Sequence, residues 1–95
     1  MIKTWASAGT RRFFETGKSK LSGLDADAAI ELLTALDEAV SLDELSPLKS
    51  VGLHKLKGDR KDQWAMTVNE RWRICFEFRK GDAYEVEIVD YHRGL

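Results

Sequence analysis

Two histidines lie among residues that suit acid–base chemistry on a phosphate. His54 precedes a group of lysines, and His92 directly follows Asp90 and Tyr91. Imidazole has an unperturbed pKa of about 6.5, so it can both accept and release a proton near neutral pH. An isolated histidine in a small domain is usually a structural or surface residue. The neighbours of these two make a catalytic role an equal alternative.

Cleavage of RNA by its own 2′-OH is a reaction that these residue types would serve. It needs a base for the 2′-OH proton, a cation for the charge that grows on the phosphate, and an acid for the departing 5′-oxygen. A guanidinium matches the geometry of phosphate oxygens, which makes Arg73, together with Lys57, a candidate phosphate clamp. Further candidates for RNA and phosphate binding lie in the same basic stretch: Lys55, Arg60 and Lys61.

The chain shows no pattern that calls for a metal ion or another cofactor. Cys75 is the single cysteine, and together with two histidines 38 positions apart it matches no metal-ligand spacing. Cys75 also lacks a basic neighbour of its own, so we expect a small residue that fills space in a strand rather than a nucleophile. Zinc modules and disulfide scaffolds are excluded, and we expect no cofactor and no metal.

Three runs in the second half of the chain alternate between apolar and polar residues, as half-buried strands do. They span residues 64–68, 72–78 and 84–88, with a tight turn at Asn69-Glu70 and a hairpin loop at 80–82 between them. We therefore expect an antiparallel meander. The face that carries Trp72, Ile74, Phe76 and Phe78 belongs to the core, as does Trp64, which leaves Arg73 on the open side of the sheet. The third run places Tyr84, Val86 and Ile88 on one face.

Two helices precede these strands. Gly9-Thr10 offers an N-cap to a short helix that ends near Gly17, and Asp25 caps a longer one over residues 26–40 whose apolar residues follow the helical period. A helical turn before Pro47 is also consistent with the sequence. The fold class that follows is α+β, with two N-terminal helices packed on one face of a small, mainly antiparallel, twisted sheet. A chain of 95 residues has room for one domain, residues 1–95.

The composition is typical of a folded protein, and acidic and basic residues lie in different segments of the chain. Hydrophobic residues make up 43% and the net charge is −1, which argues against a general nucleic-acid binder. Locally, residues 25–46 carry seven acidic side chains and no Lys or Arg, whereas residues 49–80 carry nine Lys or Arg against four acids. The basic stretch can therefore meet an anion that the total charge conceals. We see neither a signal peptide nor a membrane span, so we expect a cytoplasmic protein without a membrane partner.

Five runs, in this order and spacing, resemble the HigB toxins, a branch of the RelE/ParE superfamily of bacterial toxin-antitoxin modules. They span residues 12–17, 53–61, 64–69, 72–74 and 89–92. The resemblance implies a RelE-like fold and ribosome-dependent cleavage of mRNA, which inhibits translation. It also implies a hetero-oligomeric complex with a HigA-like antitoxin that has a helix-turn-helix domain.

The resemblance also implies which residues act. We expect His92 to be the general base, and His54 to be the acid or a group that orients the phosphate. Tyr91 would stack on a base of the message. Asp90 would fix the tautomer of a histidine or simply cap the end of its strand. The positions that match functional positions of the family are His54, Lys57, Arg73, Asp90, Tyr91 and His92.

Two other functions remain open at this point. A ParE-like toxin would bind DNA gyrase and perform no chemistry of its own, and such chains usually lack the two motifs that here carry His54 and His92. A degenerate toxin would act only as a module that binds its antitoxin. The presence of both histidines favours the ribonuclease.

Overall fold

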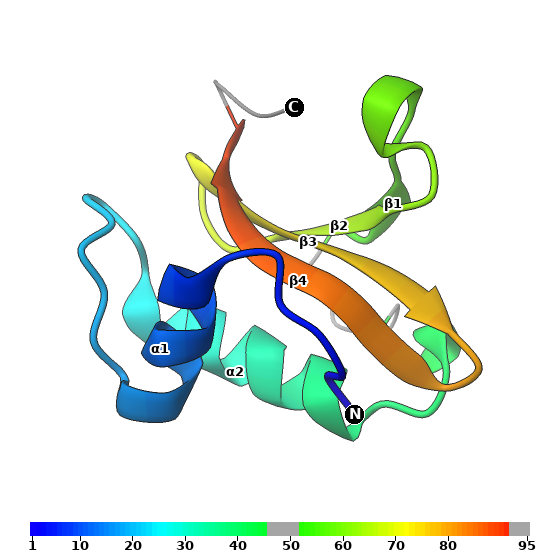
Figure 1. Cartoon of the computed structure of the whole chain (residues 1–95). Coiled ribbons are helices and arrows are strands. Elements are labelled where there is room, and N and C mark those ends of the chain that lie inside the picture. Colours follow the sequence, from blue (N-terminus) through cyan, green and yellow to red (C-terminus); the bar gives the residue numbers. More distant parts are fainter. Residues whose placement is uncertain (46–51, 92–95) are drawn as a thin grey trace.

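The computed structural model describes residues 1–45 and 52–91, in which two helices lie on one face of a four-stranded sheet (Figure 1). The strands are antiparallel neighbours in the order β1-β2-β3-β4, which confirms the α+β class. The elements are α1 (Ala8–Thr16), α2 (Ala26–Glu38), the 3-10 turn η1 (Leu42–Glu44), β1 (His54–Lys55), the 3-10 turn η2 (Gly58–Arg60), β2 (Trp64–Thr67), β3 (Trp72–Arg79) and β4 (Asp82–Asp90).

Helix α1 begins earlier than the sequence predicts. Ser7 is the N-cap and its Oγ accepts from the amide of Thr10, while Gly17 ends the helix at φ 76°, a left-handed conformation that glycine adopts without strain. The predicted cap at Gly9-Thr10 is wrong because the Thr10 hydroxyl has another partner. It is buried and accepts a hydrogen bond of 3.1 Å from the amide of Ile88 in β4. Thr10 therefore ties α1 to the sheet.

Helix α2 begins at the predicted cap, with Asp25 Oδ1 accepting from the amide of Ala28 at 3.1 Å. It ends at Glu38 rather than residue 40, and Val40 is 71% exposed. The helical turn expected after it is present as η1, while Pro47 lies outside the described residues. Burial of each leucine contributes about 2 kcal/mol, and the helix residues that reach the core are Ala29, Leu32, Leu33 and Leu36.

Strands β2 and β3 carry the predicted core face. Trp72, Ile74 and Phe76 are buried and belong to the same cluster as the leucines of α2, with Trp64 and Phe78 partly buried against it. The predicted two-residue turn is longer in the structure, because residues 68–71 all lie between the two strands. Strand β1 was not predicted, since its two residues are too few to show an alternation.

A β-bulge changes the facing of β4. Cys75 pairs with Glu87 and Glu77 pairs with Tyr84, so β4 has one residue more than β3 over this interval. The additional residue is Glu85, at φ 52°, and such an insertion reverses the alternation that follows it. Tyr84 therefore shares the face of Glu77 instead of that of Val86, and the prediction of one common face for Tyr84, Val86 and Ile88 is wrong at Tyr84.

The two loops beside the helices are joined by side chains. Asn69 Nδ2 donates to the carbonyl of Gly23 at 2.8 Å, and Trp72 Nε1 donates to the carbonyl of Ser22 at 2.9 Å. Residues 22–23 belong to the connection between α1 and α2, whereas Asn69 lies in the connection between β2 and β3. The two connections are thereby fixed to each other.

The first six residues cover the outer edge of β4. Ile2 and Trp5 form parallel bridges with Ala83 and Val86, and the amide of Lys3 donates to Ala83 O at 2.7 Å. This pairing adds a short parallel element to an otherwise antiparallel sheet. Across the described residues, every helix is too short or too polar to cross a bilayer.

Candidate active site on the outer face of the sheet

The outer face of the sheet, defined here as the face opposite the helices, brings His54 and Arg73 to the same side. Pairing runs from His54 to Ala65 and from Ala65 to Cys75, and Arg73 is two residues from Cys75 along β3. Standard sheet spacings then put the Cα atoms of His54 and Arg73 about 12 Å apart. In Figure 1, β1 and η2 rise on one side of this face and the end of β4 on the other.

A small apolar cluster fills the middle of the outer face. Ala65, Cys75 and Val89 are buried there, and Leu56 packs against them. The expectation of an open face is therefore wrong at its centre, because the chain that follows β1 folds over it. The polar groups of the face lie around this cluster rather than across it.

Cys75 is a structural member of this cluster. Burial raises the pKa of its thiol from the ordinary 9.0 to about 11, opposed by the positive charges of Arg60 and Arg73 and reinforced by Glu87. A thiol that stays protonated is a poor nucleophile, in agreement with the expectation of a residue that fills space. In residues 1–45 and 52–91, no three His, Cys, Asp or Glu side chains are grouped so as to hold a metal ion.

The guanidinium of Arg73 is fixed by the loop before β3 and by the first residue of that strand. Nη1 donates to the carbonyl oxygens of Asn69 at 2.5 Å, Trp72 at 3.1 Å and Glu70 at 3.2 Å. Its Cζ lies 4.3 Å from the centre of the Tyr91 ring, a cation–π distance. Among the described contacts, Nε and Nη2 of Arg73 have no protein acceptor. These two nitrogens of the fixed guanidinium can therefore still donate hydrogen bonds to an anion.

His54 is exposed, and one of its two nitrogens is engaged. Nδ1 lies 2.8 Å from the carbonyl oxygen of Gly52. A carbonyl only accepts, so Nδ1 must carry the proton, which leaves Nε2 as the ring nitrogen that can contact a ligand. This arrangement suits a group that exchanges a proton with a ligand on the outer face.

Asp90 and Tyr91 both contact Arg71, a residue that no sequence motif marks as functional. Arg71 Nε donates to Asp90 Oδ2 at 2.8 Å, and the amide of Tyr91 donates to the carbonyl of Arg71 at 2.6 Å. The Asp90 side chain is only 13% exposed. This ion pair is compatible with the structural role of Asp90 at the strand end, and its other role, fixing the tautomer of a histidine, stays a prediction. His92 lies outside the described residues.

The basic residues of the stretch 55–61 separate into three environments. Arg60 Nη1 pairs with Glu87 Oε1 at 3.0 Å, so its charge is matched inside the protein. Lys57 and Lys61 are exposed and flank η2. Lys55 follows His54 in β1 and therefore points to the other side; it lines a separate hollow of about 410 Å³ with Trp64, Phe78, Arg79 and the carboxylates of Asp62 and Glu77.

The partners of Arg60 and Arg71 could not be predicted from the sequence, because they depend on how distant segments lie against each other. The partners of Arg60 and Arg71 are 27 and 19 residues away in the chain. The pairing of β3 with β4 brings Arg71 to Asp90, and Arg60 reaches Glu87 because the chain after β1 folds over the outer face. The one sequence signal was that Arg71 directly precedes the strand that pairs with the end of β4. The structure thus brings His54 and Arg73 to the same face with Tyr91 beside Arg73, and it leaves Lys57 and Lys61 exposed beside η2. Arg60 and Asp90 have partners of their own.

Comparison with known proteins places this geometry in context. A family model described as the RelE-like toxin of the type II toxin-antitoxin system HigB matches residues 3–92. The Endoribonuclease HigB of Proteus vulgaris is 41% identical over 93 residues, which cover 97% of this chain and all of that protein. The crystal structure of a point mutant of YafQ from E. coli matches with a TM-score of 0.61, covering 97% of this chain and 96% of that one, at 14% identity. The last likeness is one of fold.

Proposed function

The chain belongs to the HigB-like family of RelE-like toxins of type II toxin-antitoxin systems, and from this premise we propose that it is an endoribonuclease that cleaves mRNA on the ribosome. The activity for which the relative from Proteus vulgaris is named supports the endoribonuclease. The reaction would be attack of the 2′-OH on the adjacent phosphate, which leaves a cyclic phosphate and a 5′-OH end and stops translation.

The observation that carries this proposal is the state of the Arg73 guanidinium. It is fixed by three carbonyl oxygens and the Tyr91 ring, and it keeps donor groups available on the face that also carries His54. A donor fixed in advance stabilises a phosphorane-like charge without reorganisation. A gyrase-binding surface or an inert antitoxin-binding module would not need such a group.

In the proposed mechanism each residue has one task. His92 removes the 2′-OH proton, His54 Nε2 protonates the 5′-oxygen or orients the phosphate, and Arg73 with Lys57 binds the phosphate oxygens. Tyr91, which is 44% exposed, stacks on a base of the message. Asp90 keeps the end of β4 in place through its ion pair with Arg71.

The remaining basic residues act before the chemical step. Lys61 and Lys57 attract the phosphate backbone of the message, and Lys55 adds to the field from the other side of β1. Arg60 holds η2 through Glu87 rather than binding phosphate. We further propose that residues 1–95 act as one toxin domain in the bacterial cytoplasm, where translated mRNA is found, and that a HigA-like antitoxin with a helix-turn-helix domain inhibits it in a hetero-oligomeric complex.

The decisive experiment is to map 5′-OH ends of mRNA on translating ribosomes with the wild-type protein and with His92→Ala. Cleavage by the wild type that falls by at least about 100-fold in the variant supports the proposal. DNA breaks without mRNA cuts would indicate a gyrase poison, and expression without any effect on growth would indicate a module that only binds antitoxin. Either result would overturn the ribonuclease.

A further inference from the structure

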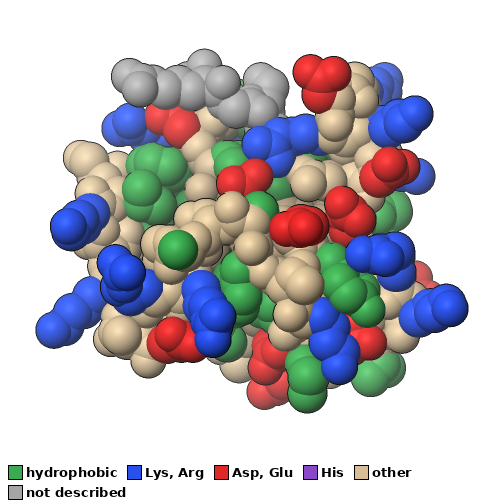
Figure 2. Space-filling view, in the orientation of Figure 1, with side chains coloured by type: hydrophobic (Ala, Val, Ile, Leu, Met, Phe, Trp, Pro, Cys, Tyr) green, Lys and Arg blue, Asp and Glu red, His purple; other side chains and the backbone are tan. Residues whose placement is uncertain are grey.

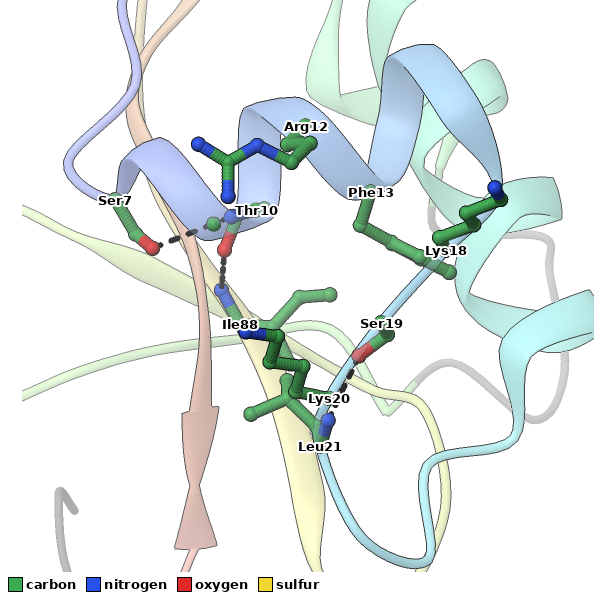
Figure 3. A pocket seen from close by; sticks show the side chains of 10 residues that line it. Ser7, Thr10, Arg12, Phe13, Lys18, Ser19, Lys20, Leu21 and Ile88 are labelled. Carbon is green, nitrogen blue, oxygen red and sulfur yellow. Dashed lines mark hydrogen bonds between the residues drawn. The ribbon is translucent and has the colours of Figure 1, made fainter.

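A pocket of about 380 Å³ lies between α1, the loop after it and β4 (Figure 3). Its walls are formed by Gly9, Thr10 and Phe13 of α1, by Leu21 of the loop, and by Ile88 of β4. The volume lies in the range of pockets that hold a ligand or an anchoring side chain. Ile88 pairs with Ile74 of the core face, so this pocket opens on the helix side of the sheet, away from the outer face.

The pocket exists before anything binds, because hydrogen bonds within the protein hold its walls. Ser7 Oγ accepts from the Thr10 amide, Thr10 Oγ1 accepts from the Ile88 amide, and Ser19 Oγ accepts from the Leu21 amide at 2.9 Å. These polar groups are satisfied internally, as the dashed lines in Figure 3 show. The interior of the pocket therefore favours a ligand or side chain whose atoms are mainly apolar.

The rim of the pocket is cationic. Arg12, Lys18 and Lys20 line it, and none of the described residues that line it is acidic. Within the part of the chain that the structure describes, none of the three forms an ion pair. In Figure 2, Lys and Arg side chains gather over α1 and the loop after it, with few carboxylates beside them. The rim therefore favours an occupant that brings negative charge to the edge.

The chemistry of the pocket fits a protein segment better than a nucleic acid. Nucleic acids without base pairing bind where aromatic rings offer an open face for stacking, and the one ring among the described lining residues, Phe13, is 1% exposed. An apolar side chain that enters a preformed pocket, with carboxylates at the rim, is a common anchor of protein interfaces.

We propose that this pocket binds an apolar side chain of the antitoxin, flanked in the antitoxin sequence by Asp or Glu residues that meet Arg12, Lys18 and Lys20. The inference rests on the proposed function for the existence of the antitoxin, and it adds where and how the antitoxin binds. It also means that the antitoxin engages a surface separate from the one that carries Arg73 and His54.

Gly9 gives a direct test, because it lines the pocket and has no side chain of its own. A Cβ at this position would meet only Ser7 Oγ, at an ordinary 3.6 Å, and both leucine and alanine favour helices more than glycine does. We expect Gly9→Leu to fill the pocket and weaken antitoxin binding by about 100-fold, while Gly9→Ala binds like the wild type. The measurement is the dissociation constant of the purified antitoxin from its own system, with growth arrest in its absence as the control for a folded toxin.

A charge reversal at the rim tests the second half of the proposal. Lys20→Glu should weaken binding by about tenfold at low salt, with a smaller effect at high salt. Lys3→Glu makes the same change of charge at an exposed residue outside the pocket, and it should bind normally. Both variants should still arrest growth when expressed alone.

The outcomes distinguish failure of the pocket proposal from failure of the proposed function. If the wild type cleaves mRNA and binds antitoxin, but Gly9→Leu binds it equally well, the pocket proposal is wrong and the proposed function stands. If the wild type binds no antitoxin, the partner assignment fails together with the pocket. Sedimentation of the toxin without antitoxin tests whether a second copy of the chain occupies the pocket. If the wild type self-associates and Gly9→Leu does not, the pocket binds a second copy, and the proposal is overturned.

Discussion

Arg73 combines a structural and a functional contact in one side chain, which makes its removal informative. We expect Arg73→Ala to lower ribosome-dependent cleavage by at least about 100-fold, because a fixed donor for phosphate charge is lost. The free energy of unfolding should fall by only about 1 to 2 kcal/mol, since two of the three carbonyls that Nη1 binds, those of Asn69 and Glu70, lie in the loop between β2 and β3. Single-turnover cleavage on ribosomes and urea unfolding measure the two effects.

Arg79 is the matched control for Arg73. It lies on the same strand and the same side, and its Cζ is 4.0 Å from the Tyr84 ring, so it also combines a charge with an aromatic contact. Arg79→Ala should retain cleavage within about threefold, since a partly solvated stacking contact contributes only about 1 kcal/mol. Equal losses in the two variants would mean that Arg73 contributes through general charge rather than through its fixed position.

Cys75 gives the protein a dependence of stability on alkaline pH. The folded state keeps the thiol protonated up to a pKa of about 11, whereas the unfolded chain loses this proton near 9.0. The folded state therefore binds more protons between these values, and the free energy of unfolding falls as pH rises from 9 towards 11, by at most about 3 kcal/mol. Below pH 9 the thiol contributes no such dependence.

Comparison with Cys75→Ala isolates this effect from other groups that titrate above pH 9. The difference in unfolding free energy between the two proteins should be constant from pH 6 to 8 and should shift in favour of Cys75→Ala from pH 9 to 11. A difference that does not change with pH would show that the thiol is solvated in the folded state.

At the residue scale, side-chain type and the alternation of residues along a strand predicted the position of Arg73 and the inertness of Cys75. They did not predict which charged side chains form ion pairs. The alternation along one strand decides which side each residue faces, and it can be seen without knowing the neighbouring strands. The ion pairs of Arg60 with Glu87 and Arg71 with Asp90 depend on the register between distant segments. Charge patterning alone therefore counts Arg60 as available for phosphate, although it is already paired.

Among the elements, β4 carries a local conflict between strand propensity and backbone conformation. Glu85 adopts φ 52°, where a β-branched side chain clashes with the backbone and glycine does not. We expect Glu85→Val to be about 2 kcal/mol less stable than Glu85→Gly, although valine is the better strand former. Chemical denaturation of both variants measures this difference.

The same two substitutions at Glu77 serve as a control. Glu77 is half-buried in β3 and borders the bulge on the opposite strand, but its own φ is not positive. Its ion pair with Arg79 is loose at 3.6 Å. There we expect valine to be more stable than glycine. The same order of stability at both positions would show that the bulge does not constrain Glu85.

Elements with strong local signals were predictable, and those made by distant contacts were not. Asp25 followed by a helical apolar period predicted the start of α2, and alternation predicted β3. The cap of α1 was misplaced because Thr10 resembles a capping residue while its hydroxyl binds Ile88 in the last strand. The bulge at Glu85 could not be predicted from the sequence, because glutamate is not a residue type that indicates a positive φ.

For the molecule as a whole, charge is divided between two faces. Lys57 and Lys61 flank η2 above the outer face, and Lys18 and Lys20 line the pocket on the helix side. The molecule measures 32 × 27 × 25 Å, so opposite faces are separated by several Debye lengths of about 8 Å at physiological salt. The two pairs of lysines should therefore act on different partners.

We expect the double variant Lys57→Glu/Lys61→Glu to bind ribosomes about 100-fold more weakly at low salt, and its affinity to depend less on salt, because fewer counterions are released. Lys18→Glu/Lys20→Glu makes the same change of charge, and it should retain ribosome binding within about threefold. Titrations at several salt concentrations test both. If the second variant loses binding and the first keeps it, the helix side and not the outer face approaches the ribosome.

The hydrogen bond from Trp72 to Ser22 has a spectroscopic consequence. The indole is 6% exposed and donates to a residue adjacent to Leu21, which walls the pocket, while Arg73, the next residue in the chain, belongs to the outer face. Any occupant that shifts Ser22 must change the surroundings of this indole. With Trp5 and Trp64 replaced by Phe, the emission maximum and lifetime of Trp72 would report such a shift, and RNA bound at Arg73 could be tested for the same signal. Trp72 is thus a built-in optical probe placed between the two surfaces.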